Sequence, residues 1–219
     1  MQMIGEIGVL LRKELVLEWR LRYAISGILL YVLSTVYIVY ASFVNVPAPT
    51  WNAVFWIIVL FASVNAIAKS FVQENGQRQL YYYILANPTS IVLAKVIYNT
   101  LLLFGLSLLC YGALGTVAGN PVKDQGLFAL GLFLGSLGFS IAFTFISAIA
   151  SKTNNSGSLM AILSFPIVIP IIKSLIKLSA SALRLIQDTA IRKDILTLTA
   201  IDTMLIALSF ILFPYLWRD

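Results

Sequence analysis

Residues 24–44 read AISGILLYVLSTVYIVYASFV, and this uncharged, apolar stretch decides the class of fold. At 1.5 Å per residue, a helix of this length matches the roughly 30 Å hydrocarbon core of a bilayer. A second apolar stretch, residues 51–68, follows after only Asn45–Thr50, which contains Pro47 and Pro49. Because prolines in so short a connection stop a helix, we predict an antiparallel hairpin of two membrane spans.

Four further apolar stretches bring the prediction to six spans, at residues 24–44, 51–68, 93–118, 127–150, 158–179 and 199–217. Of the 219 residues, 60% are hydrophobic and 11% are charged. That charged share is roughly half of the share in a soluble domain. We therefore predict an all-α membrane protein with one transmembrane domain, residues 1–219, in which residues 24–217 form a six-span helical bundle.

An amphipathic helix is predicted within residues 1–23, ahead of the first span. One stripe carries Ile4, Ile7, Leu11 and Leu15, and another carries Glu6, Lys13 and Arg20. A helix with this pattern lies in the plane of the membrane interface, with its apolar side toward the acyl chains.

The distribution of lysine and arginine predicts the orientation. With the N-terminus inside, nine of the fifteen basic residues are cytoplasmic: Arg12, Lys13, Arg20, Arg22, Lys69, Arg78, Lys95, Lys152 and Arg218. Four of these precede the first span, whose flanks usually decide the orientation. We predict that both termini are cytoplasmic.

The fifth predicted span contains two prolines, Pro166 and Pro170. Each removes a backbone donor and clashes with the preceding turn, so we expect a broken span at this point. Lys173, Lys177 and Arg184 then fall near one helical face. This pattern favours a helix on the external surface with a basic face, although a straight span whose lysines snorkel to the interface is an open alternative.

The longest polar connection runs from Lys69 to Pro88, and we predict a short cytoplasmic helix within it. Docking into a partner's groove would use a set of apolar, polar and turn residues: Glu74, Gly76, Arg78, Leu80, Tyr81, Tyr83 and Ile84. Tyrosines are also typical of an interfacial helix at headgroup level, and this alternative stays open.

A few polar or small residues interrupt the apolar runs. We expect Asp202, in the first turn of the last span, to lie at the interface, where an acid suits a helix N-terminus. A functional role inside the membrane is the open alternative. Asn65 lies near the inner end of the second span. Gly131 and Gly135 form a small-xxx-small pair that predicts close helix packing or self-association.

The sequence lacks residues and motifs that catalytic, metal-binding and nucleotide-binding sites require. The chain has no histidine, a single cysteine (Cys110) and no GxxxxGK[ST] phosphate-binding loop, so we predict no catalytic site and no cofactor or metal bound by this chain. ATP, if it drives the protein, would be bound by a partner. The net charge of +6 is spread over span ends, which favours membrane lipid and argues against nucleic acid.

Several segments together resemble one known family. Residues 134–139 read LGSLGF, and residues 162–171 read ILSFPIVIPI, similar to a proline-containing stretch of that family. The amphipathic start around Arg12 and Lys13, and the polar connection followed by Leu93-Ala94-Lys95, are similar too. Over nearly its whole length, the chain resembles the CcmB family of ABC-2-like permease subunits, also called haem exporter protein B.

The resemblance implies a permease subunit of an ABC transporter complex for c-type cytochrome maturation, in the bacterial cytoplasmic (inner) membrane. A CcmA-like ATPase would bind ATP and dock on the predicted cytoplasmic helix. The complex, with CcmC-, CcmD- and CcmE-like proteins and a second copy of this chain, would handle haem. Open alternatives are an ABC-2 exporter of lipid, polysaccharide or drug, and an ATP-independent membrane scaffold or transporter.

Overall fold

The structure is a computed structural model that describes residues 2–20, 22–43, 45–67, 87–152, 156–186 and 191–218. Every secondary-structure element assigned in these ranges is an α-helix. They are α1 (Gln2–Arg20), α2 (Arg22–Ser42), α3 (Ala48–Ile67), α5 (Pro88–Ala118), α6 (Gln125–Ala150), α7 (Ser156–Ala182) and α8 (Ile191–Arg218).

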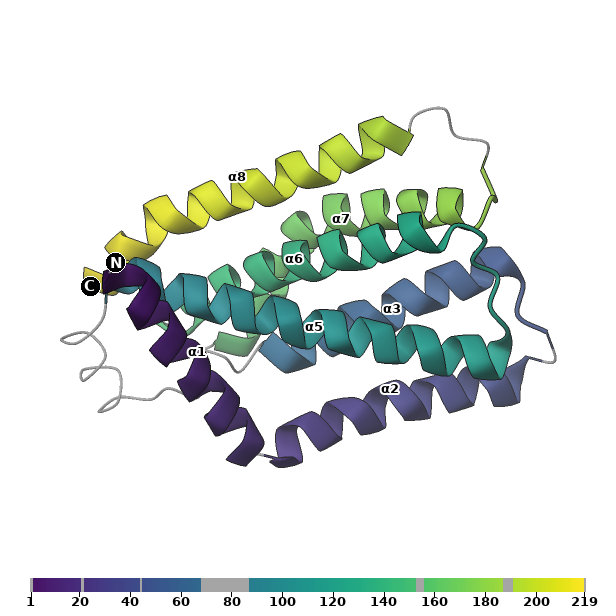
Figure 1. Cartoon of the computed structure of the whole chain (residues 1–219), viewed down its shortest axis with the longest axis horizontal. Coiled ribbons are helices and arrows are strands. Elements are labelled where there is room, and N and C mark those ends of the chain that lie inside the picture. The colour runs from purple at the N-terminus through teal and green to yellow at the C-terminus, as the bar shows by residue number, and fades with distance from the viewer. Residues whose placement is uncertain are drawn as a thin grey trace.

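Six of these helices run alongside one another, and α1 crosses one end of the bundle (Figure 1). The N-terminus and the C-terminus both lie at that end. By length and composition, α3, α5, α6, α7 and α8 can each cross a membrane, and Ser26–Ser42 of α2 forms a shorter apolar helix. Each predicted span therefore overlaps one helix, and five of these helices are long and apolar enough to cross a membrane.

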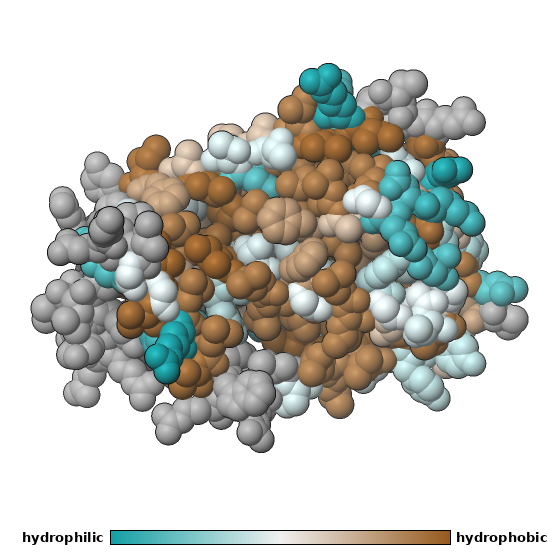
Figure 2. Space-filling model, in the orientation of Figure 1, coloured by the Kyte–Doolittle hydropathy of each residue, from teal (hydrophilic) through white to brown (hydrophobic). Residues whose placement is uncertain are grey.

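The surface fits a bilayer. Figure 2 shows apolar side chains covering the middle of the molecule, while hydrophilic side chains gather toward the ends of its long axis. Large apolar side chains such as Leu30 and Phe165 are 69% and 71% exposed. Surfaces of this kind are stable only when lipid covers them.

Helix α6 is the centre of the bundle because its small residues admit its neighbours closely. Leu178, Leu175 and Ile171 of α7 lie over Gly131, Gly135 and Gly138. A methyl group added to Gly135 would lie 3.0 Å from Leu175 Cδ1. The predicted small-residue pair thus packs α6 against α7 within one chain.

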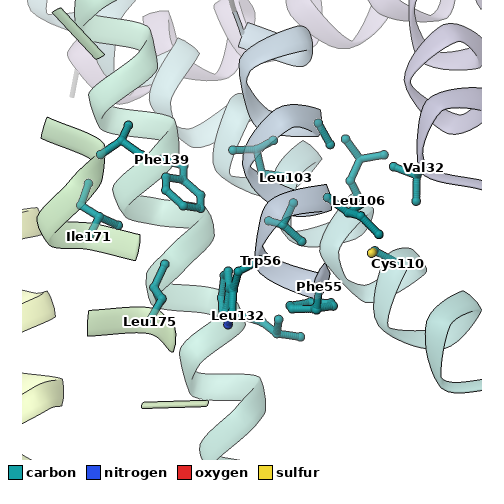
Figure 3. Close-up of a cluster of buried hydrophobic side chains, with 14 of the residues drawn as sticks. Val32, Phe55, Trp56, Leu103, Leu106, Cys110, Leu132, Phe139, Ile171 and Leu175 are labelled. Atoms are coloured by element: carbon teal, nitrogen blue, oxygen red, sulfur yellow. The ribbon is translucent and has the colours of Figure 1, made fainter. Parts of the chain in front are cut away.

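The core continues from α6 toward α3 and α2. Figure 3 shows Trp56 and Phe55 of α3 among side chains from α5, α6 and α7, with Val32 and Cys110 on the α2 side. Trp56 is 1% exposed. This apolar cluster fixes α3 between the outer helices and the central α6.

The prediction of a broken fifth span is wrong. Helix α7 is continuous from Ser156 to Ala182, with Pro166 and Pro170 inside it. Both prolines lie on its exposed face, four residues apart, so the two lost backbone bonds fall on one side. In lipid the remaining backbone groups have no partner outside the helix, and the rest of the hydrogen-bond ladder holds α7 together.

No external helix continues from α7 over residues 183–186. The helix ends in a turn where Arg184 has φ 55° and Leu185 N–H donates to Ala180 O at 3.0 Å. The N–H of Arg184 donates to Ser181 O, also at 3.0 Å. These two bonds form a left-handed cap that satisfies the last carbonyls of the helix.

Candidate functional site

The predicted docking residues lie outside the described part of the chain: Glu74, Gly76, Arg78, Leu80, Tyr81, Tyr83 and Ile84. The flanking helices are described, and they show where this segment is attached. Helix α3 ends at Ile67, and α5 begins with Pro88 in its first turn, after Asn87 in an extended conformation. Proline at this position loses no helical bond, so α5 starts sharply after the segment.

The first turns of α5 carry a polar contact with α1. Ser90 Oγ donates to Glu6 Oε2 at 3.0 Å, and Lys95 Nζ donates to Glu14 Oε1 at 3.2 Å. Between them, Leu10 packs against an apolar cluster that includes residues 91, 92 and 96 of α5. We call Glu6, Leu10, Glu14, Ser90 and Lys95 the α1–α5 contact.

The ion pair within this contact is largely shielded from solvent. The side chains of Lys95 and Glu14 are 3% and 15% exposed. Lys13 places a second ammonium 3.3 Å from the same Glu14 oxygen, with its own side chain 22% exposed. A shielded pair of this kind adds little net stability, but removing one partner is costly. Its main effect is to fix α1 at one register along α5.

The orientation of α1 differs in part from its prediction. Glu6 and Glu14 contact α5, while Leu15 and Val9 are 60% and 70% exposed, where lipid can cover them. The two glutamates are eight residues apart, which places them within about 80° on a helix. That spacing, together with a lysine (Lys95) inside an apolar run, is the sequence feature from which the contact could have been predicted.

The three residues of the predicted external basic face do not share one helical face. Lys173 and Lys177 are both exposed on α7, whereas Arg184 lies in the turn after it. Lys177 Nζ pairs with Asp194 at 3.2 Å. This pair joins the end of α7 to the first turn of α8.

A second polar network at the same end of the bundle joins α3 to α7, and sequence reasoning missed it. Trp56 Nε1 donates to Ser179 Oγ at 2.8 Å, and Ser179 Oγ donates to Asn52 Oδ1 at 2.6 Å. Asn52 Nδ2 donates to Ile176 O at 3.0 Å. Asn52 and Ser179 have no distinctive spacing, so only the fold brings them together.

The expected interfacial position of Asp202 is wrong. Helix α8 begins at Ile191, so Asp202 lies three turns into it, and the residue is 3% exposed. Asn65 is exposed on α3, and its Nδ2 donates to Phe61 O of the same helix at 3.0 Å. Of these two polar residues, only Asp202 is enclosed by the bundle.

The family of the chain follows from its sequence. The family model described as CcmB protein matches residues 6–215, nearly the whole length. No curated protein matches the chain significantly. The family supports a multi-pass transporter subunit of the ABC-type Ccm system, which is not itself an enzyme. The chain therefore belongs to the CcmB family, the haem exporter permeases of cytochrome c maturation.

Proposed function

We propose that this chain couples ATP hydrolysis by a CcmA-like ATPase to haem delivery, or to release of the haem-loaded chaperone, in c-type cytochrome maturation. The ATPase docks on the segment 71–87 at the cytoplasmic end of the bundle. Movement of that segment reaches the membrane through α5, which begins directly after it.

The α1–α5 contact is the observation that carries this mechanism. It joins α1 to α5 within the first two turns after the docking segment, through Ser90 and Lys95. Because the two polar bonds and the packing of Leu10 hold α1 at one register along α5, α1 and the start of α5 move as one unit. A displacement of the docking segment is then passed to a helix that lies across the end of the bundle (Figure 1).

The assembly and its orientation belong to the same proposal. Two copies of this chain pair with two ATPase subunits, together with CcmC-, CcmD- and CcmE-like proteins, in the bacterial inner membrane. Both termini lie at the end that carries α1, and this end is cytoplasmic. Haem is handled by the complex and ATP is bound by the ATPase. This chain contributes movement, with no catalytic site of its own.

Copurification tests the docking step. The chain is tagged and purified with the CcmA-like ATPase, first as wild type and then with Leu80, Tyr81, Tyr83 and Ile84 changed to alanine. The expected result is loss of the ATPase from the variant. Changing the exposed Ile162, Phe165 and Ile169 to alanine is the matched control and should leave association intact. Equal recovery of the ATPase with wild type and the docking variant would rule the proposal out.

Gene deletion tests the process. Holocytochrome c should disappear from cells that lack the chain and return when the wild-type gene is restored. Normal holocytochrome c in the deletion strain would instead favour an exporter of lipid, polysaccharide or drug.

A further inference from the structure

A carboxyl group is enclosed between α8 and α6. Asp202 is 3% exposed, and neither Oδ1 nor Oδ2 has a partner among the described residues. The side chain lies against Gly138 so closely that a methyl group added there would be 2.6 Å from Oδ1. Gly138 is thus the residue that lets α6 admit this carboxyl group.

No charge on the neighbouring helices compensates Asp202. The helices packed against α8 are α5, α6 and α7. Helix α6 contains no charged residue. The titratable side chains on the other two are Lys95, Tyr98, Cys110 and Tyr111 of α5 and Lys173 and Lys177 of α7. Lys95 is bonded to Glu14, Lys177 is paired with Asp194, and Lys173 is exposed.

An anion in this position would be strongly unfavourable. An ionised carboxylate without a partner in an apolar interior carries a large desolvation penalty, whereas the neutral acid carries far less. Charged groups inside a membrane bundle are rare and mark sites of function. The enclosed carboxyl group is therefore compatible with this packing when it holds a proton.

The packing around α8 provides a way to expose the group. Lys177 holds Asp194 at the outer end of α8. On the other side of Asp202, a cavity of about 300 Å³ lies between α8, α5 and α6, and Ile206, Ser209 and Phe210 of α8 line it. The hydroxyl of Ser209 is also buried, without a hydrogen-bond partner in the described residues. Helix α8 is thus paired with α7 near its start and borders a cavity one to two turns after Asp202.

We propose that Asp202 is an intramembrane proton site, occupied while α8 packs on Gly138 and emptied when α8 moves away from α6. Separation of the helices lets water reach the carboxyl group, which can then ionise. A rise in pH favours the separated state, because that state releases the proton that the packed state holds. The site thus makes the position of α8 sensitive to protons, independently of ATPase docking.

Carbodiimide labelling tests the proposal on the full chain in native membranes. The O–H of a protonated carboxylic acid adds across a C=N bond of dicyclohexylcarbodiimide, and rearrangement leaves a stable N-acylurea that carries the whole reagent mass. Peptide mass spectrometry then measures modification of Asp202 and of Asp194, whose carboxylate is paired with Lys177 and serves as the internal control.

We expect Asp202 to be labelled at least about tenfold more than Asp194 at pH 6. Above the titration midpoint of Asp202, labelling should fall by up to about tenfold for each further pH unit. In parallel, the melting temperature of the wild type should fall more on going from pH 6 to pH 9 than that of Asp202→Asn, an isosteric neutral variant. Labelling of Asp202 no greater than that of Asp194 would overturn the proposal. Labelling that does not change with pH would also overturn the proposal, since it would show that Asp202 never releases its proton. Equal falls in melting temperature for the wild type and Asp202→Asn would overturn it as well.

Discussion

Replacing Glu14 by glutamine tests the α1–α5 contact most sharply. The substitution removes a carboxylate from Lys95, whose side chain is 3% exposed. Loss of one partner from a buried pair costs about 3–5 kcal/mol. The reverse change, Lys95→Met, removes the ammonium group instead. The Glu14 side chain is 15% exposed, more than that of Lys95, and it keeps Lys13 at 3.3 Å as a partner. The cost of Lys95→Met should be smaller, about 1–3 kcal/mol. We therefore expect Glu14→Gln to be the more damaging of the two.

Thermal unfolding of the purified full-length complex measures the difference. At about 2–4 °C for each kcal/mol, Glu14→Gln should lower the melting temperature by roughly 10 °C, and Lys95→Met by roughly half as much. The double variant should lose less than the sum of the single losses, because its members share one interaction. Arg12→Gln, at an exposed position of α1, is the matched control. Equal losses for the two single variants, or additive losses in the double variant, would contradict a shielded ion pair between Glu14 and Lys95.

Three further substitutions probe the packing, each read by thermal unfolding. Gly135→Ala puts a methyl group 3.0 Å from Trp56 Cζ3 and should destabilise by about 1–3 kcal/mol, whereas Gly105→Ala, with open space around it, should be neutral or stabilising. Ser179→Ala removes the acceptor of the Trp56 indole N–H and should cost about 1–3 kcal/mol, with a change in tryptophan fluorescence; unchanged fluorescence and stability would contradict the network. Arg184→Gly should be neutral or stabilising by up to about 1 kcal/mol, because glycine adopts φ 55° without strain; a clear loss would contradict the left-handed cap.

The positions of the helices were largely predictable from sequence. Apolar runs of bilayer length each became a helix. Pro47 lies between α2 and α3 as expected, whereas Pro49 lies in the first turn of α3. The glycine spacing of α6 correctly indicated close packing, because a helix surface without side chains lets a neighbouring helix approach closely. These features depend on local composition alone.

The errors came from features that depend on the environment of a residue. Pro166 and Pro170 were expected to break a helix, as they would in water, but lipid offers the backbone no other partner and α7 continues. The expected interfacial position of Asp202 is wrong because α8 starts at Ile191, eight residues before the predicted span. The pairing of Glu14 with Lys95 joins residues 81 positions apart, and only the fold brings them together.

In the proposed mechanism, the α1–α5 contact passes the movement of the docked ATPase to the membrane helices. The most direct measurement compares ATP hydrolysis by the purified complex with holocytochrome c formed in cells, for wild type and Glu14→Gln. The proposed coupling predicts that the variant still binds the ATPase and hydrolyses ATP at the wild-type rate, while holocytochrome c falls at least about tenfold. Wild-type yield of holocytochrome c from a stably assembled Glu14→Gln complex would contradict it.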